Sequence, residues 1–470
     1  MFFSFQREFP KLEDALKTII KWKTSAERRK LLTYKAYRNG ENTFINTFSR
    51  LIWSDDEKRM VENVYAPNYK TAYGFYGNMV SQKNNALYGE IPSVDKMEMA
   101  DRKKLGFALK KAGDNASTYG YAVIYEMFNG DYKVFETPDC LIFTDDFTGE
   151  IKRVIRFWER EVNNVNYFYF EIYDEDGITT YQQAEKEKEP TVFIPKQYYK
   201  VITFSSSINT ERQSVQLKRL PIVIYRNNEE CIADLTLNVK QKIDLIDIIQ
   251  SGFANNIEEF SDVWMSINVP SATPEQVQQI KEQARRAKAI LFAGTDEKNS
   301  ADFKTLDIPY EARKTAIEMI KQELVEDTGI IDFKQITGSA TATEINARTY
   351  KLQQRVSDFE WFSDECATKL IEIWQDYNNV EFDIDITFNK LFIKNNTEIV
   401  NIANSIYGKV STKTYLNQLQ LAGVIDDVDE EIMELEKESI SKFDLGDLDF
   451  GESTQDNGQN ADELEQTDQE

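Results

Sequence analysis

The longest amphipathic pattern of the chain follows a short apolar run at residues 220–225. That run, L-P-I-V-I-Y, is typical of a buried strand, and a polar turn at 226–230 follows it. From residue 234 to residue 262, apolar residues recur at intervals of three and four, which predicts one helix about 43 Å long. Its apolar positions are Leu235, Val239, Ile243, Ile246, Ile249, Phe253, Ile257 and Phe260. Its opposite face carries Asp234, Asn238, Lys242, Asp244, Asn256 and Glu259 and is expected to be wet.

Before this helix, the spacing of apolar residues changes once, from a helical period to the alternation that is typical of strands. Residues 1–38, parts of 39–92, and 105–117 follow a helical period. Five segments rich in β-branched and aromatic residues follow, separated by turns such as Asn129-Gly130 and Asp176-Gly177, and they predict antiparallel strands. These segments are 121–127, 132–136, 151–156, 167–173 and 192–194. The pattern predicts an α+β fold.

After the long helix, the pattern predicts a compact α/β insertion between two helices. Residues 263–269, 290–293 and 303–308 have strand character, and a helix begins near Thr273-Pro274. A second long helix runs over 309–328, and a third begins at the capping box of Thr341 and Glu344. Residues 382–388 alternate apolar and acidic positions, which predicts a strand, and 391–440 predict a small helical unit. Beyond residue 445 the chain is too polar to form a packed core.

Several short motifs resemble the portal proteins of tailed double-stranded-DNA bacteriophages, specifically of the long-tailed siphophage type. The resemblance is carried in order by P-N-Y-K at 67–70, K-N-N at 83–85, Y-G-E-I-P at 88–92, Y-G-Y-A at 119–122, L-P-I-V-I-Y-R-N-N-E-E at 220–230, A-D-L at 233–235 and T-G-S-A-T-A at 337–342. It implies a portal-like subunit with an α+β wing, a long-helix stem, a small α/β clip and a helical crown.

The resemblance also implies a division of the chain. The expected parts are a wing (1–232), a first stem helix (233–262), a clip (263–308), a second stem helix (309–329), a channel loop (330–340), a helix and strand returning to the wing (341–390), a crown (391–440) and an acidic disordered tail (441–470). The function implied is a non-enzymatic ring at one capsid vertex, a conduit for DNA packaging and ejection. The implied partners are eleven further copies in a dodecamer, double-stranded DNA, terminase, a head-tail connector, and the major capsid and scaffolding proteins. The ring is expected in the virion after assembly in the bacterial host cytoplasm.

Two segments are candidate sites. The loop residues Ile330, Lys334, Gln335, Thr337, Gly338, Ser339 and Ala340 are expected to meet DNA in the channel, because this connection is long and carries a single cation. A surface loop without DNA contact is the alternative. Lys281, Arg285, Arg286 and Lys288 form a basic helix expected at the exit end of the ring, facing a connector or DNA, or else pairing with the next subunit.

The net charge of −24 at first argues against a DNA partner. Residues 426–470 hold 18 acidic and two basic residues, so 16 of the 24 excess negative charges lie in this tail. The remaining body is mildly acidic, which suits a protein that surrounds DNA without gripping it. The basic run in 1–38 is compatible with nucleic acid, an acidic partner or a solvated helix face.

Enzymatic chemistry has few candidates here. The chain has no histidine, its three cysteines stand singly among apolar neighbours, and no phosphate-binding loop motif occurs, so no cofactor or metal is expected. No apolar run approaches the ~18 residues of a membrane span. Glu381, Asp383 and Asp385 would share one face of a strand, and the alternative function is therefore a metal-dependent nuclease. A scaffolding adaptor without a channel is a third possibility.

Overall fold

The computed structural model is a mixed α and β structure, which confirms the predicted α+β class. It describes residues 3–4, 12–54, 57–63, 66–185, 187, 189–205, 210–215, 217, 219–261, 264–268, 289–292, 300–304, 310–332, 342–391, 396–421, 424–425, 428 and 431–437. The chain forms two compact units. Unit 1 comprises Met1–Thr337 and Ala347–Phe392, and unit 2 comprises Gly338–Asn346 and Ile393–Glu470.

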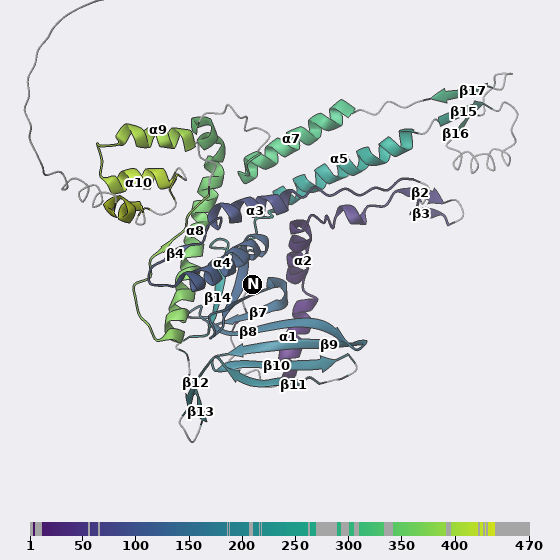
Figure 1. Cartoon of the computed structure of the whole chain (residues 1–470). Coiled ribbons are helices and arrows are strands. Elements are labelled where there is room, and N and C mark those ends of the chain that lie inside the picture. The colour runs from purple at the N-terminus through teal and green to yellow at the C-terminus, as the bar shows by residue number, and fades with distance from the viewer. Residues whose placement is uncertain are drawn as a thin grey trace, which may run out of the picture. The chain divides into compact units, whose positions relative to one another are not determined.

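Unit 1 contains the long helices. They are α1 (Leu12–Lys23), α2 (Ala26–Arg38), α3 (Phe75–Leu87), α4 (Met99–Tyr119), α5 (Leu237–Ser261), α7 (Tyr310–Thr328) and most of α8 (Ala342–Asn378), with short 3-10 turns η1 (Ile45–Thr47) and η2 (Thr137–Asp139). Figure 1 shows α5 and α7 side by side. The three long helical patterns of the sequence are therefore confirmed as α5, α7 and α8.

The largest sheet of unit 1 has the strand order β1-β7-β8-β9-β10-β11. Its strands are β1 (Phe3–Ser4), β7 (Cys140–Thr144), β8 (Ile151–Val162), β9 (Val165–Asp174), β10 (Gly177–Ala184) and β11 (Thr191–Tyr198). All neighbours pair antiparallel except β1 and β7. The predicted antiparallel strands of this region are confirmed. The predicted end of one strand at residue 156 was too early, because the last residues of β8 are exposed and no apolar pattern marks them.

Smaller sheets are formed by strands that come before and after those of the large sheet in the sequence. A three-stranded sheet has the order β14-β5-β6 and another the order β16-β15-β17. The strands of these two sheets are β5 (Tyr121–Glu126), β6 (Tyr132–Phe135), β14 (Ile222–Arg226), β15 (Trp264–Asn268), β16 (Ala289–Phe292) and β17 (Ser300–Lys304). Two hairpins are β2 (Leu51–Ser54) with β3 (Arg59–Glu62) and β12 (Lys200–Ser205) with β13 (Thr210–Val215), and a two-stranded pair from distant segments is β4 (Ser93–Val94) with β18 (Ile386–Thr387). Within the insertion, the strands predicted at 263–269 and 290–293 are confirmed as β15 and β16, whereas β17 begins at Ser300 and shares only residues 303 and 304 with the predicted 303–308.

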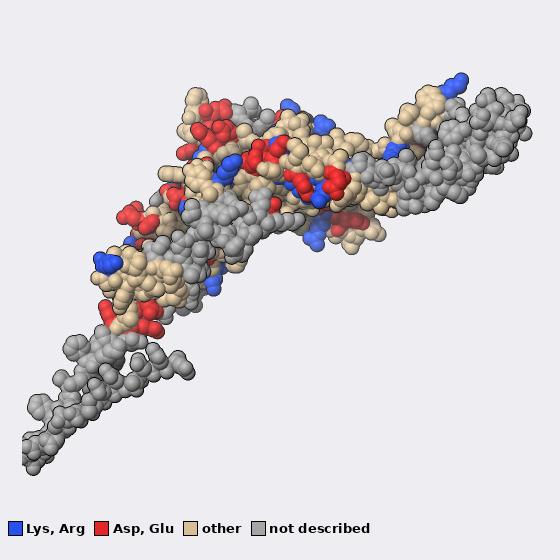
Figure 2. Space-filling view, turned by 90° about the horizontal axis from the view of Figure 1, so that it is seen from above, with Lys and Arg blue, Asp and Glu red and all other residues tan. Residues whose placement is uncertain are grey.

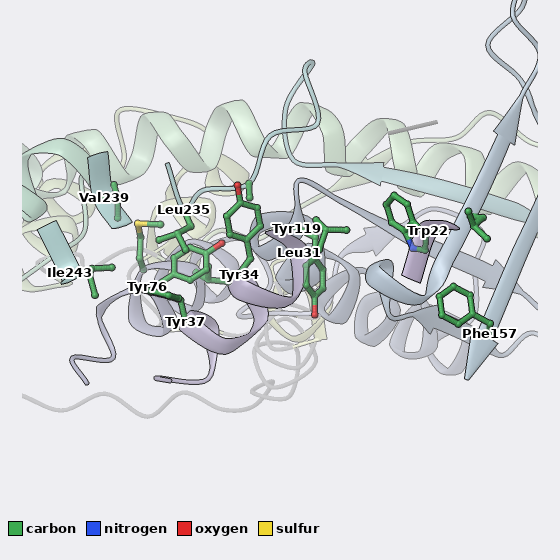
Figure 3. Packing of buried hydrophobic residues seen from close by; sticks show 14 of the residues in the cluster. Trp22, Leu31, Tyr34, Tyr37, Tyr76, Tyr119, Phe157, Leu235, Val239 and Ile243 are labelled. Atoms are coloured by element: carbon green, nitrogen blue, oxygen red, sulfur yellow. The ribbon is translucent and has the colours of Figure 1, made fainter. Parts of the chain in front are cut away.

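One continuous apolar core joins the six-stranded sheet to the long helices. Figure 3 shows it extending from Trp22 and Phe157 to Leu235, Val239 and Ile243 at the start of α5. The indole N–H of Trp22 donates to the carbonyl oxygen of Pro138 at 2.8 Å, so even this large buried ring satisfies its polar atom. Because the same core contains residues of the sheet and of α5, the first turns of α5 are fixed to the α+β part of unit 1.

Several elements differ from their predicted structure. Residues 51–62, within a region expected to be helical, form the β2–β3 hairpin instead. Residues 382–388 were expected to form a strand, but only Ile386–Thr387 pairs, with the two-residue strand β4. An alternating pattern needs a neighbouring strand to complete its hydrogen bonds, and β4 offers only two residues. The helical pattern of 1–38 is also interrupted, because Ser25 caps α2 and separates it from α1.

Unit 2 contains the helices α9 (Asn396–Ile406) and α10 (Thr412–Leu421). The Ser411 hydroxyl accepts a hydrogen bond from the backbone N–H of Thr414 at 3.2 Å and so caps α10. The rings of Tyr407 and Tyr415 lie 4.8 Å apart between their centroids and join the two helices. The predicted small helical unit is confirmed for these residues.

Replacing the buried Glu126 by glutamine is expected to stabilise unit 1. Glu126 is fully buried at the end of β5, and no cation pairs with it among the described residues. Burial, and secondarily the charge of Asp101, raises the pKa of Glu126 well above its ordinary value. The contribution of this carboxyl to stability is therefore present below the unfolded pKa near 4.5 and is lost as the pH rises toward the folded pKa, at about 1.4 kcal/mol per pH unit. Glu126→Gln should raise the thermal midpoint at pH 7 and flatten its pH dependence.

Glu171→Gln is the matched control. The Glu171 carboxylate lies 3.0 Å from Arg156 and accepts a hydrogen bond from the Tyr173 hydroxyl at 2.8 Å. Removing its charge leaves Arg156 without this partner, so the thermal midpoint should fall. Equal shifts of the midpoint in the two variants would contradict the assignment of Glu126 as an unpaired buried acid.

Candidate functional site

The helices α5 and α7 form an antiparallel pair held by polar contacts at one end and aromatic contacts at the other. The Lys242 ammonium lies 2.7 Å from Asp327 and 3.0 Å from Glu323 of α7. At the other end, the rings of Phe253 and Tyr310 lie 5.8 Å apart between their centroids. The pair therefore has a defined register along its length.

A buried cluster of charges, which we call the stem-base cluster, lies just before α5. It consists of Lys83, Asn227, Asp234 and Arg355. The Lys83 ammonium lies 2.6 Å from the Asp234 carboxylate and donates to the side-chain oxygen of Asn227 at 2.7 Å. Arg355 approaches the same carboxylate at 3.2 Å, and Asn227 donates to it at 2.9 Å. Each side chain comes from a different segment, so the cluster joins α3, the turn after β14, the approach to α5, and α8.

The ionisation of this cluster follows from its burial. Lys83 is 3% exposed, and desolvation lowers its pKa to about 8 against the opposing charge of Asp234. Burial alone would raise the pKa of Asp234, but the charges of Lys83 and Arg355 outweigh it and bring that pKa below its ordinary value. The cluster is therefore an ionised buried pair, of the kind that tolerates loss of neither partner.

Two cations of α8 hold the end of α7. The Lys351 ammonium donates to the carbonyl oxygen of Glu326 at 2.8 Å, and Arg355 donates to the carbonyl oxygen of Thr328. The last carbonyls of a helix have no partner within it and carry partial negative charge, so cations bind there favourably. Gly329 follows with a φ of +65° and ends the helix, as its position in the sequence predicts.

A second buried polar cluster lies on α5 itself. The side-chain amide of Asn42 donates to Asp244 at 3.0 Å and to Asp247 at 2.6 Å, and the Tyr37 hydroxyl donates to Asn42 at 2.8 Å and to Asp244. Asp247 also accepts from the backbone N–H of Tyr73 at 2.7 Å. Burial is the main cause that raises the pKa values of both Tyr37 and Asp247.

The extended segment at 69–73 continues along the same side of α5. Asn255 accepts from the backbone N–H of Tyr69 at 2.6 Å, and Ser251 accepts from that of Thr71 at 3.0 Å. The side chains of α5 thus satisfy backbone groups of a segment that has no regular secondary structure. This segment begins with the last two residues, Tyr69 and Lys70, of the P-N-Y-K motif noted in the sequence.

These contacts correct the predicted wet face of α5. Asp234 and Asp244 were placed on a solvated face, but Asp244 is buried, the Asp234 side chain is only 12% exposed, and both are bound within the subunit. Asn238 and Lys242 instead face α7, where Asn238 donates to Asp327 at 2.7 Å. The period of three and four correctly identified a polar side, but it could not show that other segments of the same chain cover that side.

The predicted channel loop begins in the core. Ile330 and Ile331 are each 8% exposed, and the side chain of Gln82 binds the backbone of Ile331 twice, accepting at 2.8 Å and donating at 3.0 Å. The Ile330 side chain thus packs in the core of the subunit, and its expected contact with DNA stays a prediction. Lys334, Gln335, Thr337, Gly338, Ser339 and Ala340 lie outside the described residues, as do Lys281, Arg285, Arg286 and Lys288.

Comparison with known protein families shows to which family this chain belongs. The family described as "Phage portal protein, SPP1 Gp6-like" matches residues 20–442, most of the chain. The chain belongs to this portal protein family. A portal protein is a subunit of the homo-oligomeric ring at the capsid vertex of a phage, and the family is structural rather than enzymatic.

Individual relatives agree with the family assignment. The portal protein of Clostridium phage phiCD119 is 22% identical over 458 residues, covering 90% of this chain and 96% of the relative. The portal protein of Bacillus phage SPP1 is 24% identical over 411 residues, covering 79% and 76% of the two chains. Among solved structures, a chain in the neck of an empty gene transfer agent particle is 10% identical, with a TM-score of 0.37 over 75% of this chain and 90% of that chain.

The surface and composition of this portal protein fit a structural role. On the face shown in Figure 2, Lys and Arg side chains are interspersed with Asp and Glu over the described residues. Tight binding of a phosphate backbone needs a concentration of positive charge, which this face does not present in its described part. None of the described helices is long and apolar enough to cross a membrane.

The nuclease alternative finds no support. Glu381, Asp383 and Asp385 lie in a segment without regular secondary structure, so they do not share one strand face. Among the described residues, no group of three or more Asp, Glu, Cys or His side chains has a geometry that could hold a metal ion.

Sequence reasoning found only part of the site. Lys83, Asn227 and Asp234 stand in the motifs that carry the portal resemblance. Arg355 and Gln82 were missed, because their contacts join residues 121 and 249 positions apart. No local pattern marks such a pair, so only a structure could bring them together.

Proposed function

We propose that this portal protein assembles into a closed ring of twelve subunits whose channel conducts double-stranded DNA during packaging and ejection. The same ring would receive terminase during packaging and a head-tail connector afterwards. It would form in the bacterial host cytoplasm with the scaffolding and major capsid proteins. The antiparallel pair α5 and α7 would form the stem around the channel.

The hydrogen bonds that anchor the end of α7 and the first residues after it are the observation that carries this proposal. Arg355 and Lys351 fix the last carbonyls of α7, Gln82 fixes Ile331, and α8 begins again at Ala342. A loop anchored so firmly at its start has a defined position from which to meet DNA. Its sequence contains one cation, Lys334, so each subunit would contact the phosphate backbone with little counterion release and little affinity.

The basic helix of the insertion is the second part of the proposal. Lys281, Arg285, Arg286 and Lys288 would lie at the exit end of the ring, facing the connector or the departing DNA. Charge favours this assignment, because a cluster of four cations is unusual in a chain of net charge −24. Pairing with acidic residues of the next subunit is the competing role.

Deleting residues 334–339 is expected to leave ring assembly intact and to reduce the DNA packaged or retained per particle. The deletion starts beyond the anchored Ile330 and Ile331 and therefore removes no residue of the described core. Negative-stain images of the purified variant should show annular particles like those of the wild type. DNA per particle is measured in phage assembled with the variant subunit.

A variant with six Gly and Ser residues in place of 334–339 is the control for loop length. If side-chain contact matters, both variants should lose DNA; if only length matters, the replacement should package normally. Normal packaging and retention by the deletion variant would disprove the channel-loop role. Purified wild-type protein that gives no annular particles would contradict the ring itself.

A further inference from the structure

Each side of α5 has a different covering, which its contacts define. At about 100° per residue, Lys242 and Phe253 face α7, Val239 and Ile243 face the core, and Asp247 and Ser251 face the segment at 69–73. Asn255, which also binds this segment, lies at the edge of the fourth side, at the same angle as Leu237. The fourth side contains Leu237, Gln241, Leu245, Ile248 and Gly252. We call this fourth side the open stripe.

The open stripe is mostly apolar and only partly covered by the described residues, because Ile248 and Gly252 are half-buried and Gln241 is exposed. Leu237 is 70% exposed and Leu245 is 45% exposed, although both lie on a helix whose other three sides are packed. At Gly252, a Cβ atom would meet nothing within 4 Å, and the backbone there is not left-handed. Glycine inside a helix is less stable than alanine, and nothing described in the subunit requires it at this position. The stripe therefore contains a gap suited to a side chain from outside the subunit.

The β2–β3 hairpin offers a matching apolar surface. Trp53 stands opposite Met60, and Leu51 lies two residues before Trp53, so the three side chains share one face of the hairpin. They are between 51% and 55% exposed. No third strand pairs with the hairpin in the described part of the chain, and a two-stranded hairpin alone is marginally stable in water. Exposed apolar surface of this kind marks a contact with another molecule.

The position of the hairpin along α5 indicates which part of a neighbouring subunit it can reach. The segment that follows the hairpin lies against α5 with Tyr69 beside Asn255 and Tyr73 beside Asp247, so the hairpin extends from the level of the C-terminal half of α5. Figure 1 shows the hairpin at the end of this segment. Rotation about a ring axis keeps every residue at its own height. A hairpin that reaches a neighbouring copy therefore meets the C-terminal half of that copy's α5, where Gly252 lies.

We propose that the β2–β3 hairpin of one subunit packs on the open stripe of the next subunit, with the Trp53 indole over Gly252. This inference rests on the proposed ring and names its contact surfaces. Every subunit carries one hairpin and one open stripe, so the contact is head-to-tail and can be repeated around a closed ring. The bulky indole supplies much of the buried apolar area, and the absence of a Cβ atom at Gly252 lets it approach the helix backbone.

Substitutions at Gly252 separate subunit stability from ring formation. Gly252→Ala and Gly252→Leu are both expected to raise the thermal midpoint of the dissociated subunit, because each replaces a helical glycine without an internal clash. Gly252→Leu fills the gap and should abolish the ring peak in sedimentation velocity. Trp53→Ala should abolish it as well. The smaller Gly252→Ala should weaken the ring less than Gly252→Leu does.

Cross-linking gives an independent readout. The double variant Trp53→Cys with Gly252→Cys should form a ladder of covalent oligomers on non-reducing gels after oxidation. The matched control, Phe147→Cys with Gly252→Cys, uses a side chain that is 99% exposed in the β7–β8 turn and should give no such ladder.

The outcomes distinguish the contact from the ring. Intact rings in Gly252→Leu, or a cross-linked monomer without a ladder, would overturn the proposed contact while leaving the ring in place. Wild-type protein without rings would instead overturn the ring on which the contact rests.

Discussion

Lys83→Met is expected to destabilise the base of α5 by about 3–5 kcal/mol, the range measured when one partner of a buried ion pair is removed. Lys83 is 3% exposed, and its ammonium lies 2.6 Å from Asp234. Without it, Arg355 is the one cation that remains near Asp234 in the part of the chain that the structure describes. Amide hydrogen exchange in the first turns of α5 should accelerate, and the thermal midpoint of the subunit should fall.

Two further variants test the physical reason. Lys104 pairs with Asp131 at 2.9 Å, but the two side chains are 43% and 48% exposed, so Lys104→Met should change stability by only about 0–1 kcal/mol. Asp234→Asn in the Lys83→Met background should cost less than the sum of the two single changes, because the stranded charge is removed. Strictly additive effects would show that Lys83 and Asp234 do not act as a pair.

Gly120→Ala is the second change with a large expected effect, about 2–5 kcal/mol from backbone strain and overpacking together. Gly120 ends α4 with a φ of +98°, a conformation that costs an L-residue about 1–2 kcal/mol. A Cβ atom would also lie 2.0 Å from the carbonyl oxygen of Cys231, so the turn at 227–233 would have to move. That turn carries Asn227, and the variant should therefore loosen the stem-base cluster as well as α4. Differential scanning calorimetry measures the loss.

Gly130→Ala separates backbone strain from the clash. Gly130 has a φ of +76°, but its nearest neighbours to a Cβ atom are the ends of the Asp101 and Lys104 side chains at 3.9 Å. Only the strain of about 1–2 kcal/mol is expected there. A Gly120 variant as stable as the Gly130 variant would contradict the argument from the close approach of Cys231.

The helices were predictable from local patterns, because burial of one face repeats every three to four residues. Leu352, Val356 and Phe359 of α8, for example, are all buried as their spacing predicts. The β2–β3 hairpin was missed because four-residue strands are too short to separate a period of two from a helical one. The strand at 382–388 was overpredicted, because alternation describes one strand and says nothing of its partner.

The functional site was less accessible to sequence reasoning than the fold. Motifs pointed to Lys83 and Asp234, but the sequence could not show that they bind each other. The polar side of α5 was recognised and then assigned to solvent, because the distant segments that cover it, at Asn42 and at 69–73, carry no pattern that links them to α5. Burial of polar groups depends on tertiary contacts that local periodicity does not encode.

The contacts of α8 with the end of α7 define a path for mechanical force. A push along α7 reaches the carbonyls of Glu326 and Thr328, and from there it passes through Lys351 and Arg355 into α8, with Arg355 linked to Asp234 before α5. Charge-assisted hydrogen bonds have directional geometry, whereas the hydrophobic effect is non-directional. We expect a load on α5 or on α7 to be shared with the other helix and with α8. The pair should therefore resist shear along its length.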